Sequence, residues 1–208
     1  WGVGGSPAYT DAPTWLGRNF GSNTEGLRTL ILSYLAAFGP ASVKDLQIWS
    51  GLTGLARAVD ALRAELVTFR DEQGRELFDV PGAPLPPANV PAPVRFLPDF
   101  DNLVLAHDDR QRIIANAYRP LVFPGHSMVL PTFLVDGFVR GVWKIERSTT
   151  QAKLLIQPFE PLTDNVRQDL LREGERLLHW AADKITSFEI AFVPYDGKSL
   201  GQNLWGSL

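Results

Sequence analysis

The sequence predicts an α+β protein in which a winged helix, made of three helices and a β-hairpin wing, precedes a β-rich, barrel-like module with a long helix. Apolar residues recur at helical spacing over residues 24–66, which is typical of packed helices. Residues 81–93 contain six prolines, which exclude a helix and form an extended break. Beyond it, short apolar runs separated by turn residues predict strands. The domains expected are an N-terminal arm (1–13), a winged-helix domain (14–80), a Pro-rich linker (81–93) and a β-rich α+β domain (94–208).

Composition sets limits on what this chain does. Its 208 residues are 45% hydrophobic and 21% charged, with a formal net charge of −3, which indicates a globular chain without an overall positive field. No apolar run approaches the ~20 residues of a membrane-spanning helix. The chain has no cysteine, which excludes thiol nucleophiles and favours a reducing, cytoplasmic location. It begins with Trp1 rather than Met, so we expect a portion of a longer protein.

Three helices are expected in the first module. Thr24 is placed to cap a helix that ends at Gly39-Pro40, because the residue before a proline avoids the α conformation. Ser42 is placed to cap a second helix that Gly51 ends, with Asp45 in its first turn. Thr53 is expected to cap a third helix whose inward positions run from Leu55 to Leu66.

A β-hairpin follows these helices. Two apolar runs within residues 67–80 flank Asp71-Glu72-Gln73-Gly74, a turn sequence. Three helices and a hairpin in this order predict a winged helix, in which the third helix enters the DNA groove and the hairpin is the wing. The outward polar and basic positions of the second helix, third helix and wing are then the candidate DNA-binding residues: Lys44, Gln47, Arg57, Arg63, Arg70 and Arg75.

The charge balance of this module opens a second interpretation. Residues 42–80 contain five basic and seven acidic side chains, whereas DNA-binding faces gain much of their affinity by neutralising phosphates. Winged helices also serve as packing or protein-interaction modules. The alternative is therefore a non-catalytic regulator or scaffold whose winged helix packs against another domain of the same protein.

The second module is expected to contain a meander of strands. Asp136-Gly137 lies between two apolar runs and predicts a hairpin. Residues 152–159 read as a further strand, so that the sheet is free to curl into a barrel-like form. Thr163 is placed to cap a long helix, and residues 188–193 are expected to form a closing strand.

Several polar groups are candidate sites. Asp99 and Asp101 point the same way if the chain there is extended, which suits metal binding or acid–base work in an independent hydrolase. The alternative is a turn whose side chains bond their own backbone. The run from His107 to Arg110 is either a small polar site or a helix start, with Arg110 and Arg112 following. The three histidines lack metal-ligand spacing, so we expect no metal and no cofactor.

A family resemblance rests on several segments taken together. The segments YLAAFGPASVKDLQIWSGL, RFLPDFDNLVLAHDDR, FLVDGFVRGVWKIER and LLIQPFEPL, in this order and with the proline break after the first, resemble the bacterial winged-helix family that includes the AlkZ-type DNA glycosylases. The resemblance covers roughly residues 15–193. It implies tandem winged helices followed by a β-rich module around double-stranded DNA, in proteins that remove alkylated purines and unhook interstrand crosslinks.

The catalytic motif of these glycosylases has no counterpart in the sequence. The family resemblance implies a Gln-x-Gln or Gln-x-Asp motif near the N-terminus. None of the seven glutamines here stands two residues before another Gln or an Asp. No catalytic residue can therefore be assigned, and we expect such residues, if the protein is an enzyme, upstream of Trp1. The hypothesis is the DNA-binding, C-terminal portion of a glycosylase-like DNA repair protein, with duplex DNA as partner and no membrane association.

Overall fold

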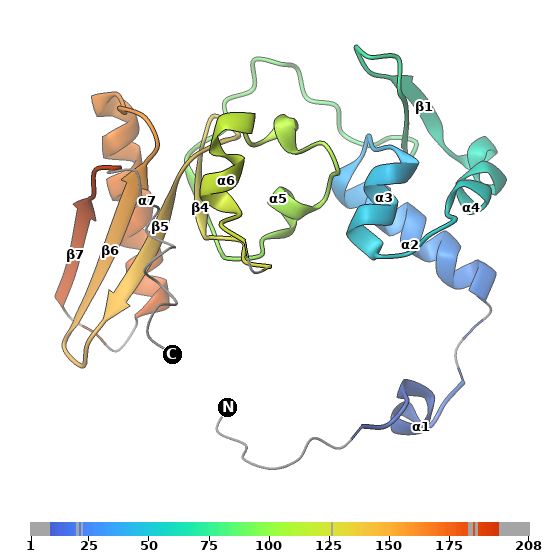
Figure 1. The fold of residues 1–208 in the computed structure, drawn as a ribbon, viewed down its shortest axis with the longest axis horizontal. Coiled ribbons are helices and arrows are strands. Elements are labelled where there is room, and N and C mark those ends of the chain that lie inside the picture. Colours follow the sequence, from blue (N-terminus) through green and yellow to red (C-terminus); the bar gives the residue numbers. More distant parts are fainter. Residues whose placement is uncertain are drawn as a thin grey trace. The chain divides into compact units, whose positions relative to one another are not determined.

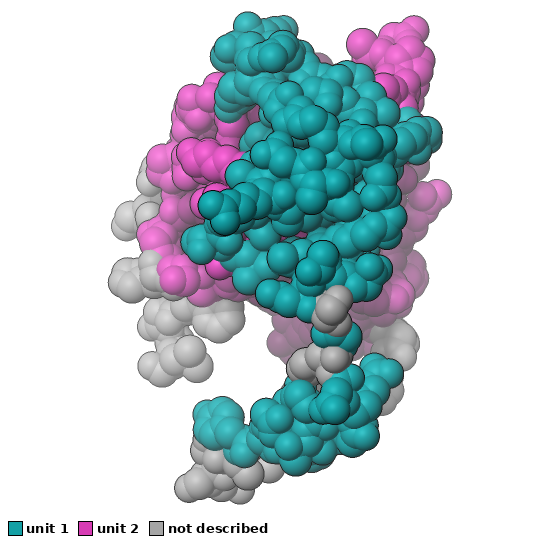
Figure 2. Space-filling model, turned by 90° about the vertical axis from the view of Figure 1, so that its right-hand side faces the viewer, with its two compact units in different colours: residues 1–43, 52–83 teal, residues 44–51, 84–208 magenta. Residues whose placement is uncertain are grey.

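A computed structural model describes residues 9–19, 21, 23–125, 127–182, 185 and 187–195 (Figure 1). The chain forms two compact units. Unit 1 comprises residues 1–43 and 52–83, and unit 2 comprises residues 44–51 and 84–208 (Figure 2). Where the chain is described, no helix is long and apolar enough to cross a bilayer.

Unit 1 is built around helix α2. Its inward face buries Ile31, Tyr34 and Leu35, as the helical spacing predicts. The elements of this unit are the helices α1 (Ala12–Leu16), α2 (Asn23–Phe38) and α4 (Ala56–Ala61), a 3₁₀ turn (Arg63–Glu65), and the strands β1 (Val67–Arg70) and β2 (Glu76–Asp79).

Three helix predictions in unit 1 need correction. Helix α2 already begins at Asn23, so Thr24 lies within the helix and is not its cap. Helix α4 follows Leu55, not a Thr53 cap, and ends at Ala61, where the chain tightens into the 3₁₀ turn. Helix α1 forms where the chain was expected to be irregular, and a proline in its first turn supplies the φ angle that a helix start needs. Residues 1–8 of the predicted arm lie outside the described residues.

The hairpin of unit 1 is confirmed. Strands β1 and β2 pair antiparallel, from Val67 with Asp79 to Arg70 with Glu76. An Asp71 carboxylate oxygen closes the turn by accepting hydrogen bonds from the backbone N–H groups of Gln73 and Arg75, at 3.0 and 2.8 Å. An isolated bridge between Ala41 and Phe78 adds a third segment beside β2.

The second predicted helix forms as α3 (Val43–Ser50), and from Lys44 onward it belongs to unit 2. Its buried Asp45 accepts a hydrogen bond from the backbone N–H of Asp108 at 2.9 Å. The indole of Trp49 donates to the Asn102 side chain at 3.3 Å. These two contacts join α3 to a segment that follows it by more than fifty residues.

An open five-stranded sheet forms the body of unit 2. Its strand order is β3-β4-β5-β6-β7, antiparallel except for the parallel pair β6–β7. The elements of this unit after α3 are the strands β3 (Arg95–Leu97), β4 (Thr132–Val135), β5 (Phe138–Arg147), β6 (Gln151–Pro158) and β7 (Ser187–Phe192), the helices α5 (Asn102–Leu105), α6 (Arg119–Val122) and α7 (Asp164–Ala181), and two 3₁₀ turns (Arg110–Arg112 and Asn116–Tyr118).

The expectation of a barrel-like sheet was wrong, because β3 and β7 remain separate edges. Helix α7 connects β6 to β7 and thereby makes these strands parallel, which a meander does not do. Leu170 and Leu178 of α7 pack with Leu154 and Ile156 of β6 in one buried cluster. A sheet whose apolar face is covered by a helix buries that face without closing.

Two local signals in unit 2 are confirmed. Asp136 and Gly137 join β4 to β5 with φ angles of 51° and 79°, the conformation that favours Asp-Gly in a two-residue hairpin. The Thr163 hydroxyl accepts a hydrogen bond from the backbone N–H of Val166 at 3.4 Å and so caps α7.

Candidate nucleic-acid interface

Arg63 of unit 1 already forms ion pairs with two acidic side chains. Its guanidinium donates to both carboxylate oxygens of Glu76, at 2.9 and 3.0 Å, and to Asp60 at 3.0 Å. It also lies 5.1 Å from the centre of the Phe78 ring. Hydrogen bonds from Arg63 lower the pKa of Glu76, and those carboxylates raise the pKa of Arg63 above its usual value. The charge expected to meet a phosphate is thus compensated within the unit.

The two arginines of the hairpin differ. Arg75 donates through Nε to Asp71 at 2.5 Å and is thus paired with the acid that closes its own turn. Arg70 donates to the backbone carbonyl of Gly74 at 3.0 Å, an uncharged acceptor. Arg70 therefore has no carboxylate hydrogen-bonded to it among the described residues, although its charge helps to lower the pKa of Glu76, which lies opposite it in the hairpin.

Arg57 on α4 is the least compensated of the predicted cations. It is exposed, and within the described part of the chain it makes no hydrogen bond or ion pair. It lines a groove of about 310 Å³ between α2 and α4, whose other walls include Leu27 and Arg28. Arg28 is paired with Glu65 at 2.6 Å. Arg57 is therefore the open positive charge of this groove.

The remaining two predicted residues, Lys44 and Gln47, lie on α3 in unit 2. The ammonium group of Lys44 is 2.6 Å from the Asp108 carboxylate and remains largely exposed. Gln47 is half-buried. The six candidates thus divide between two units, four in unit 1 and two in unit 2.

Sequence reasoning missed a group of cations in unit 2. Arg110 lies with its guanidinium 4.5 Å from the centre of the Phe123 ring. Burial lowers the pKa of Arg110, and the nearby charge of Arg119 lowers it further. Arg112 places Nη1 2.7 Å from Nε2 of the buried His107. The sequence does contain a signal for these cations, since residues 110–158 contain seven basic and only two acidic side chains.

Asp99 and Asp101, the candidate catalytic or metal-binding pair, instead belong to a turn and a helix cap. Asp101 accepts a hydrogen bond from the backbone N–H of Leu103 at 2.8 Å and caps α5. Phe100, between Asp99 and Asp101, has a φ of 54°, so the segment is not extended. Asp109 likewise caps the following 3₁₀ turn through the N–H of Gln111. Over the described residues, no group of three or more His, Asp or Glu is arranged to hold a metal.

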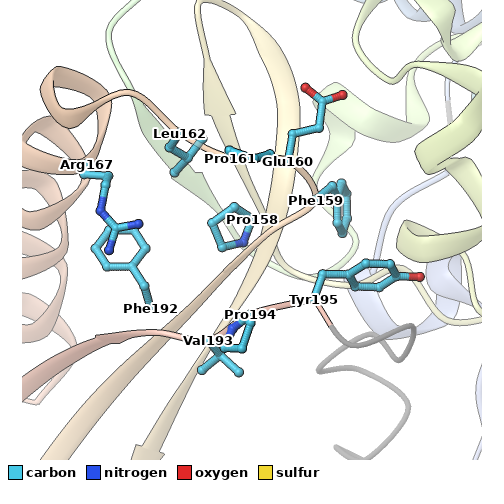
Figure 3. Close-up of a pocket in the computed structure, with 10 residues that line it drawn as sticks. All are labelled: Pro158, Phe159, Glu160, Pro161, Leu162, Arg167, Phe192, Val193, Pro194 and Tyr195. Atoms are coloured by element: carbon cyan, nitrogen blue, oxygen red, sulfur yellow. The ribbon is translucent and has the colours of Figure 1, made fainter.

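Unit 2 also contains an aromatic pocket of about 420 Å³ (Figure 3). Phe159 and Tyr195 meet edge to face at one end, with ring centres 6.3 Å apart. At the other end the guanidinium of Arg167 lies 4.1 Å from the centre of the Phe192 ring. Three prolines complete much of the lining: Pro158, Pro161 and Pro194. The pocket therefore offers flat apolar walls, one cation and the carboxylate of Glu160.

Comparison with known proteins identifies the protein family to which this chain belongs. The model of the AlkZ-like DNA glycosylase family matches residues 1–180, and the chain belongs to this family. It is 28% identical over 144 residues to an interstrand DNA cross-link repair glycosylase of Streptomyces sahachiroi, covering 65% of this chain and 37% of that protein. The solved structure of Streptomyces sahachiroi DNA glycosylase AlkZ has a TM-score of 0.67 and 22% identity, over 84% of this chain and 47% of that one. The chain thus spans less than half the length of both relatives.

Proposed function

We propose that this chain is the DNA-binding portion of a repair protein that hydrolyses the N-glycosidic bond of damaged bases in double-stranded DNA. The family match over residues 1–180 carries the proposal. The sequence contains no Gln-x-Gln or Gln-x-Asp motif. We therefore assign the hydrolytic step to residues that are not in this sequence. The role of this chain is to hold and orient the duplex, because a reaction on one base requires that base to be positioned.

The order of elements supports a winged helix within this portion. Helices α2, α3 and α4 are followed by the β1–β2 hairpin, which is the order of that fold. The bridge between Ala41 and Phe78 joins the segment that follows α2 to the hairpin through two backbone hydrogen bonds, at 2.9 and 2.8 Å. In this arrangement α4 is the recognition helix and the hairpin is the wing.

Ion pairing ranks the predicted DNA-binding residues. Arg57 and Arg70 have no carboxylate hydrogen-bonded to them in the described structure, whereas Arg63 and Arg75 do. A phosphate that approaches Arg63 or Arg75 must compete with an existing acid. We therefore assign the main phosphate contacts of unit 1 to Arg57 and Arg70.

Fluorescence anisotropy with a short duplex, at low and high salt, tests this assignment. Unmodified chain is expected to bind at low salt and to lose affinity as salt rises, because phosphate contacts release counterions. The double variant Arg57→Ala/Arg70→Ala should bind several-fold more weakly, with a salt slope shallower by about 2. Arg172→Ala is a matched control, since it removes an exposed arginine of α7 that is paired with Asp169. Equal slopes for the double variant and the control would remove Arg57 and Arg70 from the interface.

A second candidate function is a non-catalytic regulator or protein-interaction scaffold. Unit 1 carries six basic and eight acidic residues, a balance that favours packing against a protein over contact with phosphates. Absence of duplex binding at low salt would support this function. Release of an alkylated base by a longer protein that includes both this chain and a glutamine motif would support the repair function.

A further inference from the structure

We propose that Arg110 and Arg119 of unit 2 form a binding site for a backbone phosphate of DNA. The inference deepens the proposed function and rests on it, since that function supplies duplex DNA as the ligand. Neither residue is among the DNA-binding positions that the winged-helix pattern predicts. The site belongs to the segment between β3 and β4, and not to the recognition helix or the wing.

Two acids lie near Arg110 and each has another partner. Burial and the charge of Arg119 lower the pKa of Arg110, and they outweigh the charge of Asp108, which favours the charged form of Arg110. The Asp108 carboxylate lies 2.6 Å from the ammonium group of Lys44. The Asp109 carboxylate accepts the backbone N–H of Gln111 at 3.1 Å. Arg110 makes no carboxylate hydrogen bond among the described residues, and its Nε is buried without a hydrogen-bond partner. A phosphate cannot reach this buried nitrogen, but the Arg110 side chain as a whole is only half-buried, and an anion bound at its exposed part stabilises the charge that burial disfavours.

Arg119 adds a second positive charge with no compensating acid. It is exposed at the start of α6 and, where the structure is described, has no ion pair. Both residues meet at helix α6, because the backbone N–H of Phe123, whose ring the Arg110 guanidinium contacts, donates to the Arg119 carbonyl at 2.9 Å. In addition to burial, the charge of Arg119 lowers the pKa of Arg110. Two guanidinium groups that repel each other are stabilised by a shared anion, and their forked donors match the oxygens of a phosphate.

Arg110 is held by a neighbouring aromatic ring. The Phe123 ring, 4.5 Å from the Arg110 guanidinium, fixes the plane of that group. Tyr118, directly before Arg119, contacts the ring of Phe159 with centres 5.0 Å apart and so anchors the chain at the start of α6. The Arg110 guanidinium is thus ordered before DNA arrives, and less of its side-chain entropy is lost on binding.

Variants of Arg119 test the site, because this side chain is exposed and its removal leaves the core intact. Arg119→Ala should weaken duplex binding three- to tenfold at low salt and make the salt slope shallower by about 1, the value for one phosphate contact. Arg119→Lys should lose less affinity than Arg119→Ala, because the charge remains although the forked donors are lost. Arg172→Ala should change neither quantity. Wild-type affinity and slope in Arg119→Ala would overturn the site while leaving the proposed function standing.

A second measurement separates failure of the site from failure of the proposed function. The dinucleotide TpT carries one phosphodiester, and its titration is followed through the arginine Nε–H signals in NMR spectra of the full chain. A saturable shift of the Arg110 signal, lost in Arg119→Ala, supports the site even if the chain does not bind duplex DNA. No shift at millimolar dinucleotide, with wild-type duplex binding in Arg119→Ala, overturns it.

Discussion

Arg63 shows what a sequence pattern cannot reveal about a single residue. The helical spacing placed Arg63 outward, and it does lie exposed at the end of α4. Its availability depends on Glu76, thirteen residues later and on another element. The hairpin register brings Glu76 opposite Arg70 and within reach of Arg63. The outward orientation of Arg63 was therefore predictable from the sequence, but its ion pair with Glu76 was not.

The Arg63–Glu76 pair gives unit 1 a pH-dependent stability. The pKa of Glu76 is lowered in the folded chain, so the ionised carboxylate stabilises the fold above the unfolded pKa, and this contribution is lost as pH falls through the folded pKa. Glu76→Gln should lower the melting temperature slightly at pH 7, because the pair is exposed and screened. The difference from wild type should disappear by about pH 2.

Differential scanning fluorimetry from pH 7 to pH 2 measures this difference. Glu72→Gln is the control, because Glu72 is an exposed acid of the same hairpin for which the structure gives no partner. A Glu76→Gln deficit that stays constant across this range would show that it has another origin than the ion pair.

At the scale of elements, length and flanking turn sequences decided what the sequence revealed, since the four-residue strands β1, β2 and β4 were predicted from the turns beside them. Helices α2 and α7 and strands β5 and β6 are long and periodic, and all four were predicted. Strand β3 and helices α1, α5 and α6, each of three to five residues, were missed. Such short segments have little pattern of their own, and pairing with distant strands or local capping determines them.

Gly141 is the glycine on which the sheet depends most directly. It lies in β5, where an added Cβ would overlap the backbone oxygen of Gln157 on one side and the Phe133 ring on the other. Gly141→Ala should therefore reduce the free energy of unfolding by at least about 2 kcal/mol, through overpacking against a neighbouring backbone that has no room to move. Urea unfolding followed by circular dichroism measures this change.

Gly26 provides the matched substitution on an open helix face. An added Cβ at this position of α2 meets no atom within 4 Å. Gly26→Ala should raise the free energy of unfolding by up to about 1 kcal/mol, from helix propensity alone. Similar effects of the two substitutions would contradict the packing described for β5.

At the scale of the whole molecule, the division expected along the sequence differs from the grouping that spatial contacts produce. The Pro-rich stretch suggested a division in sequence, with residues 14–80 before it and 94–208 after it. Contacts instead group residues 44–51 with residues 84–208. The buried bond from Asp108 to Asp45 spans 63 residues, and no local pattern in the sequence signals it. The linear domain boundaries therefore stay a prediction.

Hydrogen exchange should mark the Pro-rich segment. Residues 84–93 are without helix or strand, and most of them are exposed. Of their few amide groups, Val90 donates one backbone hydrogen bond, to Pro87 at 3.1 Å. Peptides covering this segment should exchange within seconds, whereas peptides from β5 and β6 should stay protected for hours. Slow exchange in the Pro-rich segment would show that it is covered in solution.

The parallel pairing of β6 with β7 has a consequence for biosynthesis. On the ribosome, β6 emerges before the eighteen residues of α7, and its partner β7 emerges only afterwards. Until then one edge of a strongly apolar strand has unsatisfied backbone groups and is open to strands of other nascent chains. Slow elongation through the codons of α7 prolongs this exposure and should increase co-translational aggregation.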